Sequence, residues 1–187
     1  MNIGVLGGTF DPPHDAHLRI AERSIDQFTL DKVIFIPSGN PWQKKDATSY
    51  RHRYEMTKIL IGDSNDLEIS DIENSEEKPS YTYETLKKLN HPKEKLYFIL
   101  GSDAAINIKT WKNYELLSNL TNFLIALRSE DNIDVLEKNF PFNYEIISGD
   151  KLDLSSTTLR NKLKEKNIEV SDLPSEVLTY IKENSLY

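Results

Sequence analysis

Two histidines stand three residues apart near the start of the chain, where a segment with helical spacing begins. This interval places His14 and His17 on the same side of the predicted helix. The N-terminus of a helix carries free N–H groups and the positive end of the helix dipole, which together favour bound anions. Both imidazoles are therefore candidates to donate hydrogen bonds to phosphate oxygens. The alternatives are a packing role for each histidine or a metal pair, although no carboxylates at ligand spacing complete a metal site.

Two glycines, Gly7 and Gly8, end a short apolar run just before these histidines. Glycine accepts a positive φ and lets the backbone approach a ligand closely. The pair therefore predicts either a phosphate-facing loop or a plain tight turn. The spacing is neither GxGxxG nor GxxxxGKS/T, which excludes the dinucleotide-binding fingerprint and the P-loop.

A second polar motif, LSSTTLR, runs from Leu154 to Arg160 near the other end of the chain. Serine and threonine hydroxyls cap helix N-termini, and the free N–H groups of such an end can face a phosphate. Arg160 lies one turn further along, where its guanidinium group suits phosphate oxygens. The alternative is a serine-capped amphipathic helix whose arginine is solvated.

The segments around these motifs predict strands that alternate with helices. Short apolar runs predict strands, and longer stretches with helical spacing predict helices. Such alternation is typical of an α/β fold, a doubly wound, Rossmann-like parallel sheet with helices on both faces, which binds ligands beyond the carboxyl ends of its strands. The predicted strands are Ile3–Leu6, Lys32–Ile36, Leu67–Ile72, Leu96–Leu100, Phe123–Leu127 and Tyr144–Ile147. The predicted helices are Ala16–Phe28 with Asp15 as N-cap, Tyr50–Ile61, Thr82–Leu89, Asn113–Leu117, Ile133–Asn139, Ser156–Lys166 and Pro174–Glu183.

Length and composition restrict the class of protein. The 187 residues fit one domain over 1–187, in which the helices from about residue 155 pack on the sheet because two helices alone bury too little core. A net charge of −7 disfavours nucleic acid as a partner but leaves a small anionic substrate open. There are no cysteines, no recognisable signal region and no apolar stretch of the roughly 18 residues that span a membrane. We therefore expect a cytoplasmic protein with no membrane partner and no thiol chemistry.

The stretch from Gly7 to His17, GGTFDPPHDAH, resembles the GG(T/S)FDPxHxGH signature of the nucleotidyltransferase superfamily, with Ala16 where glycine is commonest. The LSSTTLR motif resembles the ISSTxIR motif of the same superfamily. Further segments make essentially the whole chain similar to the bacterial nicotinate mononucleotide adenylyltransferases. These segments are GNPWQK at 39–44, RYEM at 53–56, PSYTYETL at 79–86, GSD at 101–103, Trp111, and the tail from Leu173 to Tyr187.

This resemblance implies an enzyme of NAD biosynthesis. In the implied reaction the 5′-phosphate of nicotinate mononucleotide attacks the α-phosphorus of ATP, which gives nicotinic acid adenine dinucleotide and pyrophosphate. Mg²⁺ is implied as an ion carried on ATP and not as an ion held in a metal site of the protein. The residues implied to be catalytic are His14, His17 and Arg160.

The resemblance also assigns residues to the two substrates. Trp111 is expected to stack on the pyridine ring, and Asp103 is expected to meet the adenosine ribose or a water on Mg²⁺. The residues implied for ATP are Gly7, Gly8, Thr9, Phe10, His17, Gly101, Asp103, Ser156, Thr157 and Arg160. Those implied for the mononucleotide are Lys44, Thr82, Trp111 and Arg128.

Several alternatives stay open. Lys44 could be a solvated neighbour of Lys45, Trp111 a loop anchor in the core, and Asp103 only a helix N-cap. Arg53 is either part of a positive field or a surface residue. The same fold also serves other acceptors, including nicotinamide mononucleotide, and a non-catalytic nucleotide-binding module is the alternative from another class. The oligomeric state has no signature in the sequence.

Overall fold

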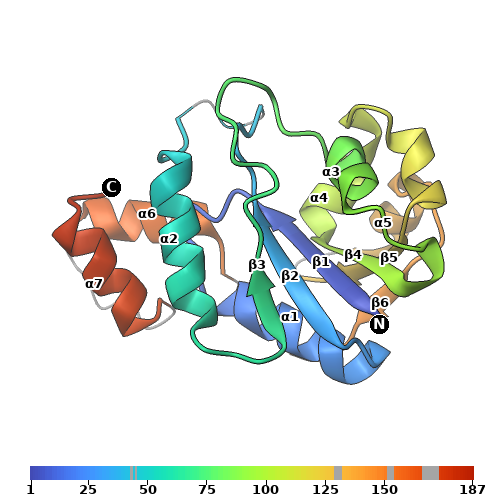
Figure 1. Ribbon diagram of the computed structural model, residues 1–187, viewed down its shortest axis with the longest axis horizontal. Coiled ribbons are helices and arrows are strands. Elements are labelled where there is room, and N and C mark those ends of the chain that lie inside the picture. The colour runs from blue at the N-terminus through green and yellow to red at the C-terminus, as the bar shows by residue number, and fades with distance from the viewer. Residues whose placement is uncertain (43, 45, 129–131, 151–153, 166–172) are drawn as a thin grey trace.

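Short parallel strands form the centre of the molecule (Figure 1). The computed structural model describes residues 1–187 except 43, 45, 129–131, 151–153 and 166–172. Within the described chain the sheet has six strands in the order β3-β2-β1-β4-β5-β6, and every neighbouring pair is parallel. This order confirms the predicted doubly wound fold. The strands are β1 (Ile3–Gly8), β2 (Lys32–Pro37), β3 (Leu67–Ile69), β4 (Leu96–Gly101), β5 (Asn122–Ala126) and β6 (Glu145–Ile147).

The helices follow the predicted spans closely where helical spacing was long. The α-helices are α1 (Asp15–Phe28), α2 (Tyr50–Ile61), α3 (Thr82–Leu89), α4 (Ser102–Ile106), α5 (Ile133–Asn139), α6 (Ser156–Lys164) and α7 (Ser175–Glu183). The 3₁₀ turns are η1 (Lys93–Lys95), η2 (Ile108–Thr110) and η3 (Tyr114–Asn119). Helix α4 was not predicted, because five residues are too few to show a 3.6-residue period. The predicted end of the Ser156–Lys166 helix lies outside the described residues.

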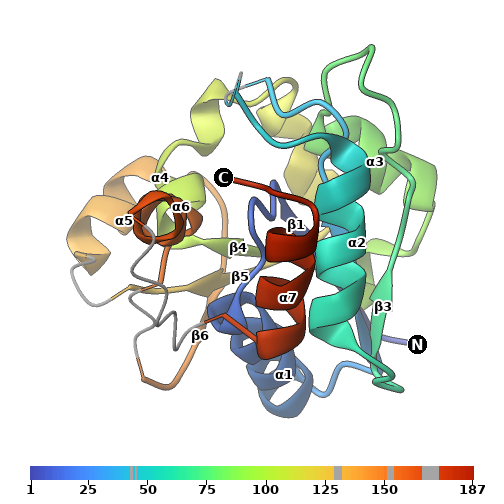
Figure 2. The same ribbon diagram turned by 90° about the vertical axis from the view of Figure 1, so that its left-hand side faces the viewer.

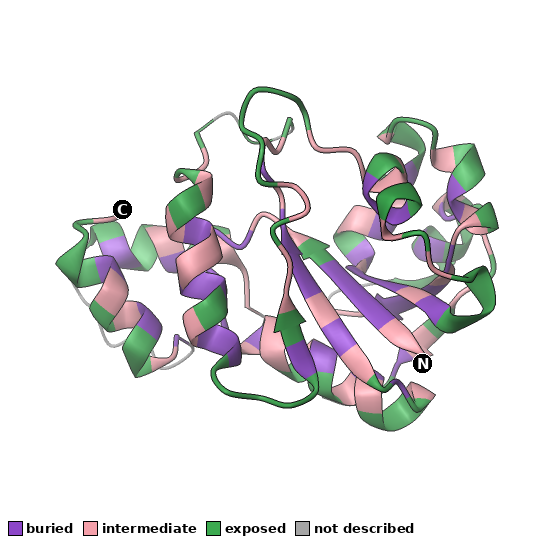
Figure 3. Ribbon diagram, viewed as in Figure 1, coloured by how far each residue is buried: buried purple, intermediate pink, exposed green. Residues whose placement is uncertain are grey.

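The central strands are largely buried (Figure 3), and their alternate residues belong to core clusters on opposite faces of the sheet. One face packs against α1, α2, α6 and α7, and the other against α3, α4 and α5. Leu6 and Phe35 lie on the first face, and their neighbours Val5 and Ile36 lie on the second. Burial on both faces explains why these strands read as continuous apolar runs.

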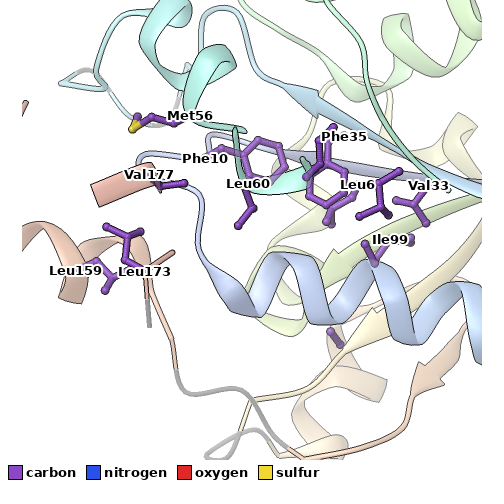
Figure 4. Close-up of a cluster of buried hydrophobic side chains, with 14 of the residues drawn as sticks. Leu6, Phe10, Val33, Phe35, Met56, Leu60, Ile99, Leu159, Leu173 and Val177 are labelled. Carbon is purple, nitrogen blue, oxygen red and sulfur yellow. The ribbon is translucent and has the colours of Figure 1, made fainter. Parts of the chain in front are cut away.

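The cluster of the first face extends from the sheet into the C-terminal helices (Figure 4). Leu159, Leu173 and Val177 are buried in the same cluster as Phe10 and Phe35. Figure 2 shows α7 beside α2, with the chain end between α2 and α6. The C-terminal helices therefore share the core of the sheet, as the single-domain hypothesis requires. No helix in the described part of the chain is long and apolar enough to cross a membrane.

The strand order places the switch point between β1 and β4. From β1 the chain moves outward through β2 and β3, and from β4 it moves the opposite way through β5 and β6. The carboxyl ends of these central strands meet at one edge of the sheet, where doubly wound folds bind their ligands. Among the predicted site residues, the segments that leave this edge after Gly8, Gly101 and Ala126 carry both histidines, Asp103 and Arg128.

Candidate active site

The loop after β1 brings the two histidines together at the start of α1. His14 is the N-cap residue of the helix, so the predicted N-cap, Asp15, was wrong by one position. The backbone N–H of His14 donates to Nδ1 of His17 at 3.2 Å, and the two ring centroids lie 3.8 Å apart with a tilt of 31°. The three-residue interval has thus put both imidazoles on the same side, as predicted.

Both imidazoles are neutral near pH 7. Burial, with a smaller contribution from Arg128, lowers the pKa of His14 to about 4. Burial also lowers the pKa of His17 well below its usual value, and the positive charges of Lys44 and Arg128 add to this. Because Nδ1 of neutral His17 accepts the His14 N–H, its proton resides on Nε2. His17 therefore presents one N–H donor of fixed position.

The two glycines are part of a strand and not of the loop or turn that was predicted for them. Gly7 and Gly8 belong to β1, and the positive φ of this segment occurs at Phe10, at 52°. The ring of Phe10 is 2 % exposed and packs edge-on against His17 at 4.9 Å between centroids. A Cβ atom on Gly8 would lie 3.0 Å from that ring. A side chain at position 8 would therefore crowd the Phe10 ring where it packs against His17.

The LSSTTLR motif docks on this same loop. The Ser156 hydroxyl donates to the Pro12 carbonyl at 2.9 Å, and Nη1 of Arg160 donates to the Asp11 carbonyl at 2.7 Å. Nη2 of Arg160 donates to the Thr157 hydroxyl at 3.3 Å. Two motifs far apart in sequence therefore form one surface, and two of their predicted phosphate ligands also bind the histidine loop.

The cap of α6 is a serine, as predicted. Ser155 is its N-cap residue, and its hydroxyl accepts the backbone N–H of Thr158 at 3.1 Å. Thr157, in the first turn, is exposed. The beginning of α6 thus keeps an accessible polar side chain beside the histidine loop.

Three cationic side chains, those of Lys44, Arg128 and Arg160, lie in the region of the histidines. Arg128 lies just after β5, and its Nη2 atom is 3.3 Å from the carboxylate of Asp103. Asp103 belongs to α4, which directly follows β4. Burial, followed by the nearby charge of Arg160, lowers the pKa of Lys44. Mutual crowding of cations of this kind is relieved by a bound polyanion. A Cβ atom on Gly101 would lie 2.8 Å from Oδ1 of Asp103, so a larger residue there would shift this side chain.

The residues predicted for the mononucleotide base lie on the second face of the sheet. Trp111 packs edge-on against Phe98 of β4, with ring centroids 6.2 Å apart, so it is anchored in the core as one alternative held. The Lys112 ammonium group lies 4.4 Å from the ring centroid of Tyr81. This contact joins the residue after Trp111 to the residue before Thr82, the first residue of α3.

Arg53 is a buried residue beside the site whose role the sequence interpretation left undecided. Its side chain is 1 % exposed and donates to three backbone carbonyls, those of Thr48 (2.6 Å), Thr9 (2.8 Å) and Gly39 (3.1 Å). Arg53 therefore joins the loop after β1, the loop after β2 and the segment before α2. A signal was present in the sequence, because Met56 and Leu60 follow at helical spacing and mark this side of α2 as the buried one.

A surface hollow lies apart from the predicted site residues. This hollow, of about 590 Å³, is lined by Ser49, Tyr50, Arg51, Asn74, Ser75, Glu76 and Glu77, none of which was predicted as a site residue.

Among the residues that the structure describes, no group of three or more histidine, aspartate or glutamate side chains could hold a metal ion. Gln43 and Lys45, beside Lys44, lie outside the described residues.

Comparison with known proteins connects this geometry to a family. A family model described as "Cytidylyltransferase-like" matches residues 5–162. A protein of Desulfitobacterium hafniense (strain Y51), named "Probable nicotinate-nucleotide adenylyltransferase", is 39% identical over 196 residues, which cover 99% of this chain and 95% of that protein. A protein of the same name from Clostridium novyi (strain NT) is 39% identical, over 98% of both chains.

Solved structures agree with these relatives. A nicotinic acid mononucleotide adenylyltransferase of Plasmodium falciparum, complexed with NaAD, superposes with a TM-score of 0.83 at 29% identity, covering 100% of this chain and 97% of that one. The same enzyme complexed with APC gives a TM-score of 0.80 at 27% identity, covering 100% and 96%. The resemblance seen in the sequence is confirmed. This chain belongs to the cytidylyltransferase-like family and, within it, to the nicotinate-nucleotide adenylyltransferases.

Proposed function

We propose that this chain transfers the adenylyl group of ATP to nicotinate mononucleotide, giving nicotinic acid adenine dinucleotide and pyrophosphate. The observation that carries the proposal is the docking of the α6 motif on the histidine loop, with Ser156 and Arg160 bound to the Pro12 and Asp11 carbonyls. This contact gathers imidazoles, hydroxyls and cations at the carboxyl edge of β1 and β4. Relatives named for this activity, and a relative bound to NaAD, support the assignment.

The chemistry requires positioning and charge stabilisation. An oxygen of the acceptor's 5′-phosphate forms a bond to the α-phosphorus of ATP, while the bond from that phosphorus to the bridging oxygen breaks and pyrophosphate leaves. The attacking phosphate is already an anion, so no side chain has to remove a proton. The enzyme holds the reactants in line and offsets the negative charge that moves onto the leaving group.

The histidine pair fits the charge-stabilising role. The Nε2–H of His17 has a fixed direction because Nδ1 is occupied by the His14 N–H. The buried Nδ1 atom of His14 has no hydrogen-bond partner among the described residues, so its bonding capacity is unused in this structure. The hydrogen bond from a neutral imidazole N–H becomes stronger as negative charge develops on the oxygen that accepts it.

We assign the surrounding residues to the phosphates of ATP. The backbone from Gly7 to Phe10 would lie along the nucleotide, and Thr157 with Arg160 would contact its outer phosphates. Ser156 would act mainly by fixing the loop, since its hydroxyl is bound to Pro12. Mg²⁺ would arrive on ATP with several waters of its own, and Asp103, after Gly101, would meet one of those waters or the ribose. The ATP analogue bound to the Plasmodium relative supports ATP as the donor.

The acceptor side is assigned to Lys44, Thr82, Trp111 and Arg128. Trp111 is held by Phe98, which fixes the ring without covering it fully, so a pyridine ring can stack on it. Lys44 and Arg128 would contact the phosphate of the mononucleotide. The choice of nicotinate over nicotinamide rests on the relatives, because backbone N–H groups can select a carboxylate without any diagnostic side chain.

A substrate panel tests the proposal directly. Pyrophosphate release would be measured with ATP and either nicotinate mononucleotide, nicotinamide mononucleotide or phosphopantetheine. We expect the highest kcat/KM with nicotinate mononucleotide. Release that is fastest with another acceptor would contradict the assigned substrate, and no release with any acceptor would contradict the activity. The cytoplasmic location and the absence of nucleic-acid partners stay predictions.

A further inference from the structure

One buried carboxylate connects three parts of the chain beside the candidate active site. Asp11 is 3 % exposed, and its Oδ2 atom accepts the backbone N–H of Thr48 at 3.2 Å. Its Oδ1 atom accepts the hydroxyl of Tyr187 at 2.5 Å. A buried carboxylate is costly unless hydrogen bonds compensate it, so these two donors are essential to its position.

Each partner of Asp11 belongs to a different element of the site. Asp11 itself stands three residues before His14 in the loop after β1. Thr48 ends the segment that carries Lys44 and leads into α2, and its carbonyl is one of the three held by Arg53. Tyr187 follows α7. The side chain of Asp11 therefore joins the histidine loop to the Lys44 segment and to the C-terminal tail.

Tyr187 is built to donate this bond. Burial and the hydrogen bond to Asp11 raise its pKa, so the hydroxyl stays a neutral donor at any physiological pH. Its side chain packs against the core cluster that contains Phe10 and Val177. Its backbone has a φ of 69°, in the left-handed region that a non-glycine residue adopts only when its surroundings hold it there.

The same loop is held from the other side by α6. The Asp11 carbonyl accepts Arg160, and the Pro12 carbonyl accepts Ser156. The loop that ends in His14 is thus held at its backbone by α6 and at its side chain by the tail. Removal of the tail contact alone would leave the α6 contacts in place, so its effect can be measured separately.

We propose that Tyr187 is a positioning residue of the active site: its hydrogen bond to Asp11 fixes the loop that presents His14 and His17, an inference that rests on the proposed function. The physical reason is the sensitivity of phosphoryl chemistry to geometry. A displacement of about 1 Å in a group that contacts the reacting atoms costs on the order of 100-fold in rate. A loop released on one side and still held by α6 should move by less than this.

The test replaces only the hydroxyl, by Tyr187→Phe. We expect the kcat/KM for ATP to fall by about tenfold, a fraction of the full positional effect. The KM for nicotinate mononucleotide should change by less than about twofold, because the Thr48 N–H still ties the Lys44 segment to Asp11, and Trp111 and Thr82 lie on the other face of the sheet. The matched control is Tyr180→Phe, which removes a hydroxyl that bonds to Nδ1 of His52 at 3.0 Å, and should stay within about twofold of the wild type.

The pattern of losses decides the outcome. Equal losses in both variants, an unchanged Tyr187→Phe enzyme, or a similar rise in the KM of both substrates would overturn the inference. A second variant, Asp11→Asn, keeps an oxygen acceptor for the Thr48 N–H, turns an amide NH2 towards Tyr187, and removes the negative charge near Lys44 and Arg53. We expect a loss at least as large as that of Tyr187→Phe, and we expect the double variant to be no worse than Asp11→Asn alone, since the bond from Tyr187 to the carboxylate is already lost in that variant.

The inference and the proposed function fail in different ways. If the wild-type protein releases no pyrophosphate with any acceptor, the proposed function is wrong. The positioning claim is then tested by the equilibrium affinity for ATP with Mg²⁺, measured by calorimetry. An affinity at least about threefold weaker in Tyr187→Phe than in Tyr180→Phe would support it, and equal affinities would overturn it.

Discussion

At His17 one accepted hydrogen bond determines what the side chain offers to a ligand. With Nδ1 occupied by the His14 N–H at 3.2 Å, the neutral ring can only donate, and it donates from Nε2. The contact with Phe10 fixes the plane of the ring. A donor with a fixed position is what stabilisation of a developing charge requires, because it does not have to reorganise during the reaction.

The first prediction concerns this donor. His17→Ala should lower kcat/KM by about 100-fold or more, equivalent to about 2.7 kcal/mol of transition-state stabilisation. Steady-state pyrophosphate release with ATP and nicotinate mononucleotide measures it. His91→Ala is the control, because His91 bonds to the Met1 carbonyl at 3.1 Å and was not predicted as a site residue. A loss of less than about tenfold for His17→Ala would remove this imidazole from the reaction.

The second prediction concerns the dependence of stability on pH. The pKa of His14 is about 4 in the folded chain and about 6.5 in the unfolded chain, so the unfolded state binds more protons between these values. The contribution of His14 to stability is therefore fully present above pH 6.5 and is lost as the pH falls towards 4. Between pH 7 and pH 5 this amounts to about 2 kcal/mol.

Urea unfolding at both pH values checks this prediction. In His14→Gln the unfolding free energy should fall by about 2 kcal/mol less between pH 7 and pH 5 than in the wild type. His91→Gln serves as the control for removal of an imidazole elsewhere on the chain. If the unfolding free energy fell by the same amount between pH 7 and pH 5 in the wild type and in His14→Gln, the burial of His14 would have no energetic consequence.

At the scale of elements, the site depends on loops that are tied to one another by buried polar groups. Arg53 of α2 donates to three carbonyls, one in the loop after β1 and two in the connection between β2 and α2, and Gly39 of that connection lies against the segment after β3. A Cβ atom on Gly39 would lie 1.8 Å from the Glu73 carbonyl oxygen. The loops after β1, β2 and β3 are therefore packed as one unit at the carboxyl edge of the sheet.

The third prediction concerns the three hydrogen bonds of Arg53. Arg53→Ala leaves one buried and two half-buried carbonyls without their donor and creates a cavity at a fully buried side chain, so it should lower the unfolding free energy by about 3 kcal/mol. Arg51→Ala, an exposed arginine on the same helix, should change it by less than about 0.5 kcal/mol. Urea denaturation monitored by circular dichroism measures both. Equal effects of the two substitutions would mean that the hydrogen bonds of Arg53 contribute nothing to stability.

At the scale of the whole molecule, one core extends from the sheet into the C-terminal helices. Leu159 of α6 and Val177 of α7 are fully buried together with Phe35 of β2. Because α6 also carries Ser156 and Arg160, the same packing that stabilises the C-terminus holds half of the candidate site against the histidine loop. Folding of these helices on the sheet is thus a condition for the site to exist.

The fourth prediction follows from this shared core. Leu159→Ala should lower the unfolding free energy by about 2 to 5 kcal/mol and should shift the one transition of the whole chain, seen alike by tryptophan fluorescence and circular dichroism. Leu116→Ala, at a leucine that is 43 % exposed, should cost less than about 0.5 kcal/mol. Two separate transitions would contradict the single-domain hypothesis.

Much of this protein could be predicted from its sequence alone. The alternation of apolar runs with helical spacing predicted the parallel sheet, and several helices match their predicted bounds, Tyr50–Ile61 and Thr82–Leu89 among them. The two motifs indicated the family, because such motifs record which backbone N–H groups and side chains must face a phosphate. These are local properties, set by the conformational preferences of neighbouring residues, so a linear sequence expresses them.

Only the tertiary structure decided which polar atoms meet. Nothing local to Phe10 shows that it, and not a glycine, takes the positive φ, and nothing near Asp11 shows that Tyr187 binds it. The burial of Arg53 likewise depends on the loop after β1 and on both ends of the connection between β2 and α2, which converge around it. Desolvation and hydrogen-bond pairing depend on every segment packed around a group. They are therefore fixed only when the whole chain has folded.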